Sequence, residues 1–494
     1  MPKPITASML YNFVQCPHRV NLDFYGDSDK KDKISVFVQL LWEKGNEYEK
    51  EVIENLDIPF ADLSSLRGDE KENATTEAMS RGNDLIYSGR IKEGDLLGEP
   101  DLLRKQGDGY IAGDIKSGAG EEGSDLDDRK PKKHYAVQLA LYTDILERLG
   151  SCSGRTPFVW DINGEEIIYD LEELQGRRNP ISLWSIYQGT LNQVEHISSN
   201  EGVTLPANSS ICKLCQWRTV CLTDLEGNND LSLIPELGRA KRDAILPHIK
   251  DLKELAAIDI DSLIEGKKTI IPGIGPASLE KFQARANLQT QKGSAPYLTE
   301  AVDLPPSEVE LFFDIETDPM RDVCYLHGFV KRKNQDNSTE EFHSFYAEEP
   351  SPEYEKQAFK DAFEFIRDSQ PCLIYYYSKY ERTIWRKLQK RYPDVASEEK
   401  IEDIFSTENS VDLYYDVVKP KTEWPTRDFS IKTLASYIGF TWRDADPSGA
   451  SSIEWYHRWV ENKDETIKNR ILEYNEDDCV ATRVLLDKIR RLSI

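Results

Sequence analysis

The chain has 494 residues, 39% of them hydrophobic and 10% aromatic, enough for about three domains with packed cores. Its net charge of −26 argues against a generic nucleic-acid coat protein, which depends on neutralising phosphates, but is compatible with an enzyme that has a local basic track. The sequence has neither an apolar run long enough to span a membrane nor a signal-peptide pattern, so we expect a cytoplasmic protein without a membrane partner.

The predicted elements divide the chain into three parts, 1–225, 226–295 and 305–494, and indicate an α/β multidomain protein. The first part begins with elements of mixed type. In chain order these are an amphipathic helix over 39–56, strands over 84–105 and 109–118 joined by a turn at 107–109, a charged Gly-rich loop over 118–133, and a helix over 134–150 that ends at Gly150.

The sequences GEPD at 98–101 and GDIK at 113–116 place carboxylates on these two strands. A hairpin would bring Asp101 and Asp114 to one end of a sheet, and Lys116 would share the strand face of Asp114. Carboxylates of this kind hold Mg²⁺ or Mn²⁺ for phosphodiester hydrolysis, and an ammonium beside them steadies the transition state. We therefore predict a metal-dependent nuclease site.

Three further side chains are candidates for the same site. Gln138 and Tyr142 share a face of the second helix, and Glu49 on the first helix is a candidate ligand of the same metal. Each has a structural alternative: Tyr142 as a core residue, Glu49 on a solvated helix face, and Gln138 as a cap for a backbone group.

Four cysteines lie near the two ends of the first part: Cys16, and then Cys212, Cys215 and Cys221 with C-x2-C-x5-C spacing. In a reducing cytosol such clusters are more often metal ligands than disulfides. Four thiolates accept either structural zinc or an iron–sulfur cluster, and spacing does not separate the two. We expect the bound metal to tie the two ends of this part together.

Together, GEPDLL, GDIKSG, QLALY and the flanking cysteines resemble the RecB-like branch of the PD-(D/E)xK nucleases that carries an iron–sulfur cluster. The resemblance implies a restriction-endonuclease-like fold. Asp101 and Asp114 would be metal ligands, Lys116 the catalytic lysine, and Gln138 and Tyr142 the last motif. It also implies a [4Fe–4S] cluster on the four cysteines. Many relatives have histidine where this chain has Glu49, so a preference for Mn²⁺ does not carry over.

The middle part is predicted to be helical and contains two similar turns, IPELGRAKRDAI and IPGIGPASLEKF. The second resembles a helix–hairpin–helix (HhH) motif. Gly273 and Gly275 would allow a tight turn whose backbone N–H groups bind a nucleic-acid phosphate. The alternative is a plain helical spacer.

The third part begins with an apolar strand, VELFFDIET, which places Asp314 and Glu316 on one face. Near the end of the chain, Tyr474 and Asp478 share a helix face in YNEDDCVAT, and Glu381 follows the apolar strand PCLIYYY. Two carboxylates spaced in this way suit a pair of metal ions, and a tyrosine can hydrogen-bond the attacking water.

These motifs resemble the DnaQ-like DEDD exonucleases of the ribonuclease-H-like α/β fold, in the branch with tyrosine in its last motif. The resemblance implies that Asp314, Glu316, Glu381 and Asp478 form the metal site with Tyr474 beside it. Relatives usually have aspartate where this chain has Glu381. Asp412 is the reserve candidate, an exposed helix position is the alternative for Glu381, and Lys432 is expected near substrate phosphate.

The order of the three parts resembles a bacterial family of RecB-like nucleases that has both domains in one polypeptide. It implies a metal-dependent DNA nuclease, an exonuclease acting on single-stranded ends in repair, recombination or defence. The sequence has no G-x4-GK[ST] phosphate loop, so unwinding would need a separate helicase partner. The alternatives are a non-catalytic or single-site adaptor that works with a helicase, and an exonuclease that acts on RNA.

Overall fold

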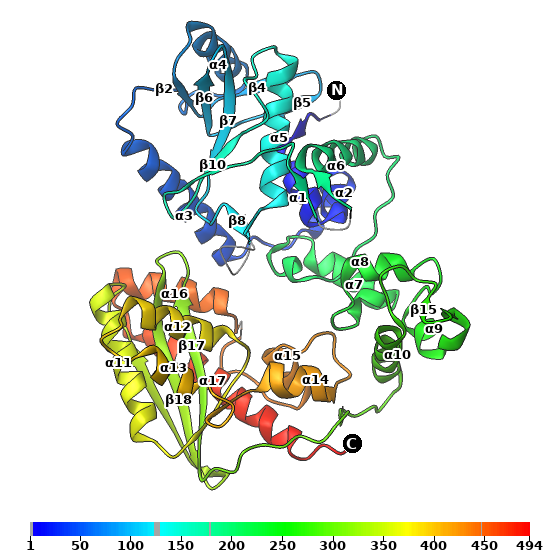
Figure 1. Cartoon of the computed structure of the whole chain (residues 1–494), viewed down its shortest axis with the longest axis vertical. Helices are drawn as coiled ribbons and strands as arrows, with labels where there is room; N and C mark the ends of the chain where they lie inside the picture. The colour runs from blue at the N-terminus through cyan, green and yellow to red at the C-terminus, as the bar shows by residue number, and fades with distance from the viewer. Residues whose placement is uncertain (1–2, 123–128, 177–178, 446) are drawn as a thin grey trace. The chain divides into compact units, whose positions relative to one another are not determined.

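The structure is a computed structural model that describes residues 3–122, 129–176, 179–445 and 447–494 (Figure 1). It contains two compact units. The first runs to Pro206 and takes in Ser210–Cys221, and the second comprises Ala207–Ser209 and Leu222–Ile494. The helical middle part, treated separately above, belongs to the second unit. In the described part of the chain, no helix has the length and apolar character needed to cross a membrane.

The first unit combines short strands with longer helices. In chain order its elements are β1 (Ile5–Thr6), α1 (Ala7–Gln15), α2 (Pro17–Tyr25), α3 (Val36–Glu54), β2 (Ala61–Asp62), α4 (Gly68–Arg81), β3 (Leu85–Tyr87), β4 (Ile91–Glu93), β5 (Leu96–Gly98), β6 (Leu102–Gln106), β7 (Gly109–Ile115), β8 (Glu121–Glu122), β9 (Lys130–Pro131), α5 (Lys133–Arg148), β10 (Phe158–Trp160), β11 (Glu166–Ile168), β12 (Leu174–Gln175), β13 (Ile181–Ser182) and α6 (Leu183–Ser198).

The main sheet of this unit has the strand order β11-β10-β7-β6-β3-β2. Its central strand β7 is buried along its whole length, and α5 packs against one face of the sheet (Figure 1). The predicted helices over 39–56 and 134–150 correspond to α3 and α5, and the turn at 107–109 joins β6 to β7. Residues 123–128 of the predicted 118–133 loop lie outside the described residues.

The prediction of one strand over 84–105 is wrong. The segment forms four short strands, of which β3 and β6 join the main sheet while β4 and β5 pair in a separate sheet with β1. The reason lies in two turns, because Ser88 has φ 58° and Gly94 has φ 58°. A residue with left-handed backbone conformation ends a strand, so the alternation of apolar and polar residues over 84–105 predicts one long strand where the chain forms several short ones.

The second unit carries the helical block and a larger sheet. From the end of the first unit onward, its elements are α7 (Arg218–Gly227), α8 (Gly238–Ile245), α9 (Leu252–Ala257), β14 (Ile264–Glu265), β15 (Lys268–Thr269), α10 (Pro276–Thr290), β16 (Tyr297–Leu298), β17 (Val309–Asp318), β18 (Val323–Lys333), β19 (Asp336–Tyr346), α11 (Pro352–Asp368), β20 (Leu373–Tyr376), α12 (Tyr380–Arg391), α13 (Glu398–Ile404), β21 (Ser410–Asp412), α14 (Lys419–Lys421), β22 (Thr422–Glu423), α15 (Ile431–Tyr437), α16 (Gly449–Asn462) and α17 (Glu465–Ile489).

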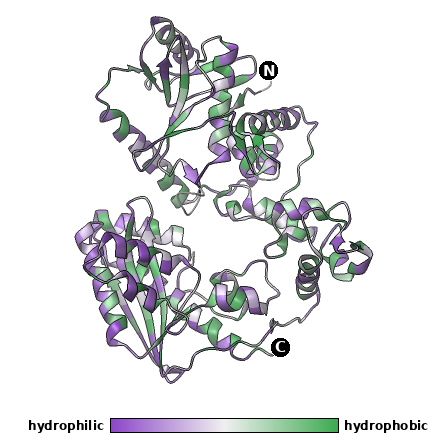
Figure 2. Cartoon of the chain, in the orientation of Figure 1, coloured by the Kyte–Doolittle hydropathy of each residue, from purple (hydrophilic) through white to green (hydrophobic). Residues whose placement is uncertain are grey.

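The five-stranded sheet has the order β19-β18-β17-β20-β21, with β17, β18 and β19 antiparallel and β20 and β21 parallel to β17. Alternate residues of β17 pack into hydrophobic cores on opposite faces of the sheet. Phe313 packs with α11 and α12, whereas Phe312 packs with α17 on the opposite face. Asp314 and Glu316 continue the face of Phe312, so the alternation directs both carboxylates toward α17. The central strands of this sheet carry much hydrophobic colour, and the helices around it carry much hydrophilic colour (Figure 2).

The helical block is held to the rest of the second unit by a buried arginine. Arg285 on α10 is 0% exposed and donates to both carboxylate oxygens of Glu423, at 2.7 and 3.2 Å. It also donates to the backbone oxygen of Pro235 at 2.8 Å and to Glu236 at 3.1 Å. A guanidinium with this many charged partners fixes α10 against β22.

Candidate active sites

The first candidate site lies where β6 begins and β7 ends. Because the two strands are antiparallel, Asp101, just before β6, and Asp114, near the end of β7, lie at the same end of the pair. The Asp101 carboxylate accepts the Ile115 N–H at 2.8 Å, and Lys116 Nζ is 2.9 Å from Asp114 Oδ2. The structure thus brings together Asp101, Asp114 and Lys116, the three side chains that the GEPD and GDIK motifs supply.

Charge is concentrated in this buried place. Burial and the neighbouring Asp114 raise the pKa of Asp101 to about 8. Burial disfavours the charge on Lys116, but Asp114 and Asp101 outweigh it and raise the lysine pKa above its ordinary value. Lys116 therefore stays a cation at neutral pH and is suited to steady negative charge rather than to accept a proton.

Glu49 reaches this site from α3. Tyr87 at the end of β3 donates its hydroxyl to Glu49 Oε1 at 2.9 Å, and the Glu49 charge contributes to the raised pKa of Asp101. The glutamate is thus held by a tyrosine and faces the other carboxylates. Nothing in the local sequence indicates this role of Tyr87, because it depends on the pairing of β3 with β6.

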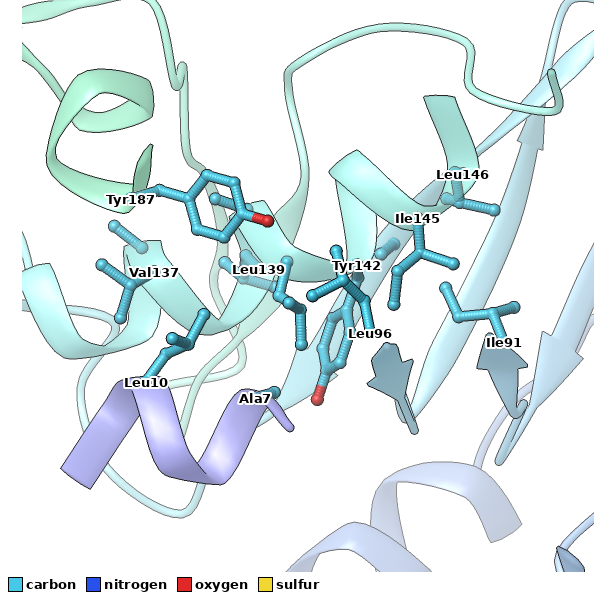
Figure 3. Close-up of a cluster of buried hydrophobic side chains, with 14 of the residues drawn as sticks. Ala7, Leu10, Ile91, Leu96, Val137, Leu139, Tyr142, Ile145, Leu146 and Tyr187 are labelled. Atoms are coloured by element: carbon cyan, nitrogen blue, oxygen red, sulfur yellow. The ribbon is translucent and has the colours of Figure 1, made fainter. Parts of the chain in front are cut away.

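Tyr142 is a core residue whose hydroxyl lies at the first candidate site. Its ring is 2% exposed and lies in the core cluster with Leu96 and Ile145 (Figure 3), as the structural alternative requires. Its hydroxyl accepts from Gln138 Nε2 at 3.2 Å, and burial, Asp114 and Asp101 raise its pKa well above the ordinary value. Tyr142 is therefore a core residue whose polar end faces the carboxylates, and Gln138 contacts that end.

The second candidate site is the most compact group of ligands in the described residues. Asp314, Glu316 and Asp478 each offer a carboxylate oxygen, and these oxygens all lie within 4.8 Å of one another. Across the described ranges, no other trio of His, Cys, Asp or Glu side chains meets this distance. β17 supplies two of the three carboxylates and α17 supplies the third.

These carboxylates repel one another away from water. Burial and Asp478 raise the pKa of Glu316 to about 8, and burial with Asp478 and Glu316 raises that of Asp314 well above its ordinary value. A divalent cation would relieve this repulsion, and oxygen ligands are those that Mg²⁺ and Mn²⁺ prefer. The donor set therefore fits a hard divalent cation.

Polar neighbours fix the cluster from three elements. Asn475 Nδ2 donates to Asp314 Oδ2 at 2.7 Å, and Trp442 Nε1 donates to Asp478 Oδ1 at 2.7 Å. Lys432 Nζ on α15 donates to the Tyr474 hydroxyl at 2.7 Å and lies 3.3 Å from both Asp478 oxygens. Lys432, expected near phosphate, is thus beside the carboxylates.

Glu381 lies at the start of α12 and is 3% exposed, so the alternative of an exposed helix residue is wrong. Burial and the charges of Asp412 and Asp478 raise its pKa well above the ordinary value. The reserve candidate Asp412 has a structural task, because its Oδ1 accepts the backbone N–H groups of Tyr414 and Tyr415 at 3.0 Å. Neither residue belongs to the compact trio.

Two family models match the chain. Residues 15–222 match a model of the PD-(D/E)XK nuclease superfamily, and residues 311–490 match a model of the RNase H superfamily. The chain combines a PD-(D/E)XK nuclease domain with an RNase H-superfamily domain. Both superfamilies indicate a hydrolase that cleaves phosphodiester bonds of a nucleic acid. No curated protein matches the chain.

The cysteines lie on two segments of the PD-(D/E)XK domain that contact each other. Cys16 lies between α1 and α2, and the segment 210–221 returns to this unit. Trp217, 2% exposed, donates to Asp23 at 2.9 Å, and the Thr219 N–H donates to Asp32 at 2.9 Å. Polar contacts thus join the two ends of the domain where the cysteines lie.

The four cysteines Cys16, Cys212, Cys215 and Cys221 are all half-buried. Burial raises the pKa of Cys215, and the charges of Cys16 and Cys212 contribute in the same direction. In the described residues no three of these sulfur atoms lie within 4.8 Å of one another. Cys16, Cys212 and Cys215 are close enough for their charges to interact, and a metal ion shared by the four cysteines remains a prediction.

The two glycines predicted to bind phosphate flank the start of α10. Gly273 has φ 77°, a left-handed conformation that favours glycine, and Gly275 is the N-cap of α10. The conformation of Gly273 is compatible with a tight turn, while the helix–hairpin–helix motif and phosphate binding there remain predictions.

Two further residues at the RNase H-superfamily cluster, Asn475 and Trp442, were not predicted from the sequence. Asn475 lies next to Tyr474 in a motif already singled out, so its position on the helix was a usable signal. Trp442 lies in an irregular segment 36 residues before Asp478, and nothing local to it indicates the contact.

Proposed function

We propose that the protein is a metal-dependent exonuclease that acts on single-stranded DNA ends, with the Asp314–Glu316–Asp478 cluster as its main catalytic site. The observation that carries the proposal is the convergence of three carboxylate oxygens within 4.8 Å in an RNase H-superfamily domain, from the buried Glu316 and Asp478 and the half-buried Asp314. A divalent cation held by these residues would activate water and offset charge on the phosphate.

The residues around the cluster support particular tasks. Burial and Asp478 raise the pKa of Tyr474 well above its ordinary value, so its hydroxyl keeps its proton and orients water or phosphate as a donor. Lys432 donates a hydrogen bond to that hydroxyl and offers a positive charge to a phosphate oxygen. Asn475 and Trp442 fix the rotamers of Asp314 and Asp478.

The experiment compares wild type with Asp314→Asn, Asp114→Asn and the double variant on end-labelled single-stranded DNA, duplex DNA and RNA in Mn²⁺ or Mg²⁺. Asp368→Asn, an exposed aspartate at the end of α11, is the control. We expect Asp314→Asn to abolish stepwise shortening of single-stranded DNA and Asp368→Asn to leave it intact. Equal cleavage by all variants contradicts the proposal, and preference for RNA redirects it to an RNA exonuclease.

For the PD-(D/E)XK domain we propose a second cleavage site at Asp101, Asp114 and Lys116, with Glu49 as a further ligand and Gln138 and Tyr142 alongside. A [4Fe–4S] cluster on Cys16, Cys212, Cys215 and Cys221 would tie the domain's ends together, with structural zinc as the alternative. Anaerobic purification followed by iron, sulfide and zinc analysis of wild type and Cys215→Ser separates the two. Protein that contains neither metal contradicts both.

A single-site enzyme is the second candidate, because only the RNase H-superfamily cluster meets the three-ligand distance in the described residues. In that case Asp114→Asn cleaves as wild type does and Asp314→Asn is inactive. The PD-(D/E)XK domain would then bind nucleic acid, alone or as an adaptor for a separate helicase.

A further inference from the structure

We propose that a cavity between α10, residues 425–427 and α15 binds a short single-stranded segment and guides it to the Asp314–Glu316–Asp478 cluster. The cavity is a wide depression open to solvent, has a volume of about 710 Å³ and lies within the second unit. Small-molecule and cofactor sites have volumes of about 300–1,000 Å³. The inference rests on the proposed function of that cluster and adds the place where the strand is held.

Lys432 connects the cavity to the cluster. Its side chain lines the cavity, while its Nζ donates to Tyr474 and lies 3.3 Å from both oxygens of Asp478. A phosphate in the cavity would therefore be one side chain away from the carboxylates. A strand that leaves the cleavage site in this direction passes directly into the cavity.

The lining matches a sugar–phosphate backbone. Arg427 and Lys432 provide two cations, and Thr433 and Ser436 provide hydroxyl groups. Arg427 is 46% exposed and forms an ion pair with Glu226. Exposed pairs of this kind are weak, so a phosphate oxygen competes readily for the guanidinium. In a chain with a net charge of −26, two cations on one cavity form a local site for an anionic strand.

One aromatic ring is presented to the cavity in a fixed orientation. Tyr437 is 41% exposed, its ring meets the edge of Trp424 at a centroid distance of 6.1 Å, and its hydroxyl donates to the Ser294 backbone oxygen at 3.3 Å. A ring fixed at both ends is a platform on which a base stacks. Every base has such a face, so stacking tolerates any sequence.

Gln289 has a different task. Its amide donates to the backbone oxygens of Leu233 at 3.3 Å and Thr426 at 2.9 Å, so it joins α10 to the wall of the cavity instead of reading base edges. We therefore expect binding without sequence preference, in which the helical block forms one wall of the strand site.

The binding experiment uses the full chain with Asp314→Asn in EDTA, so that cleavage does not interfere. Fluorescence anisotropy measures the Kd for labelled oligothymidylate of about ten nucleotides, within the range of single-strand site sizes. Tyr437→Ala is compared with Tyr354→Ala, a tyrosine on α11 with 39% exposure, and Arg427→Ala with Arg386→Ala, whose arginine has the same 46% exposure and also pairs with a glutamate.

We expect Tyr437→Ala to raise the Kd roughly tenfold, while Tyr437→Phe, which keeps the ring but loses the hydrogen bond to Ser294, should raise it much less. Arg427→Ala should lower the slope of log Kd against log salt by about 0.7, the loss of one phosphate contact. Competition with thymidine monophosphate shows whether the cavity takes a free nucleotide instead; full displacement at equal concentration overturns the strand assignment.

The two proposals fail separately. If wild type cleaves DNA but Tyr437→Ala and Arg427→Ala bind as their matched controls do, the cavity inference is wrong and the cleavage proposal stands. If both variants weaken binding but wild type cleaves nothing in Mn²⁺ or Mg²⁺, the strand site stands and the exonuclease proposal is wrong.

Discussion

Replacing Gly328 with alanine places a methyl group where α17 meets the sheet. Gly328 lies directly opposite Asp314 in the pairing of β17 with β18, and a Cβ atom there would lie 1.6 Å from Asn475 Oδ1. Asn475 is 0% exposed, so its side chain has no open space to move into. Either α17 shifts away from the sheet or Asn475 gives up its hydrogen bond to Asp314.

The size of the effect follows from these contacts. Overpacking a filled core costs about 1–3 kcal/mol, and losing a hydrogen bond to a charged group costs about 1.5–3 kcal/mol. Whichever of the two occurs, we expect Gly328→Ala to lower the free energy of unfolding by about 1–3 kcal/mol. Cleavage at the Asp314 site should fall about 100-fold, because displacement of a catalytic group by about 1 Å has an effect of this order.

Urea unfolding followed by tryptophan fluorescence and cleavage assays in Mn²⁺ measure both effects. Gly449→Ala is the matched control, because it is the first residue of α16 and has no atoms within 4 Å of its would-be Cβ. Adding Asn475→Ala removes the severe clash and leaves only Phe342 Cε2 at 3.1 Å from the new Cβ, so Gly328→Ala should cost much less stability in the Asn475→Ala background than in wild type. A Gly328→Ala protein as stable and active as Gly449→Ala would refute the reasoning.

Three further predictions concern other buried groups. Burial lowers the pKa of His327 to about 3, against about 6.5 in an unfolded chain. The contribution of neutral His327 to the free energy of unfolding is therefore complete above about pH 6.5 and is lost as the pH falls toward 3. His327→Gln should make the free energy of unfolding depend less on pH in this range, and an unchanged dependence contradicts the assignment. Arg285→Met leaves Glu423 without its buried partner and should cost about 3–5 kcal/mol in urea unfolding, of which Arg285→Lys recovers only part; a neutral effect would mean that Glu423 is neutralised in another way. Trp217→Phe removes the hydrogen bond to Asp23 and should cost the first unit about 1–3 kcal/mol in thermal denaturation, while cleavage that depends on Asp314 stays at the wild-type rate; loss of that cleavage contradicts a local effect.

The elements with strong periodicity were predictable from sequence. The buried strand β17 and the helix α5 lie where the apolar patterns place them, and Tyr474 and Asp478 lie on one helix, α17, as their spacing predicts. The pairing of Asp314 with Glu316 followed from the alternation of strand residues, and the pairing of Tyr474 with Asp478 from helical spacing. Both pairs lie within one strand or one helix, so a short segment of sequence is enough to predict them.

The remaining features depend on contacts between distant segments. Gly328 allows α17 to approach, and the need for glycine appears only when Asn475 is opposite it. Arg285 and Glu423 are 138 residues apart, so the attachment of the helical block leaves no local trace. The carboxyl group of Glu381 is buried because the fold covers the start of α12, although the sequence there is polar. These three features therefore depend on tertiary packing and cannot be predicted from the periodicity of the sequence.

The acidity of the chain and its proposed substrate are compatible for a physical reason. Charges separated by more than about 8–10 Å are largely screened at physiological salt, so a net charge of −26 matters less to a bound strand than the groups beside it. Those groups are the carboxylates of Asp314 and Glu316, whose pKa values are raised, and the cations Lys432 and Arg427, which line the cavity. Without a divalent cation the carboxylates repel a phosphate, and with one they attract it through the metal. Binding of metal and binding of the scissile phosphate should therefore strengthen each other, whereas the cavity contacts of Tyr437 and Arg427 operate without metal.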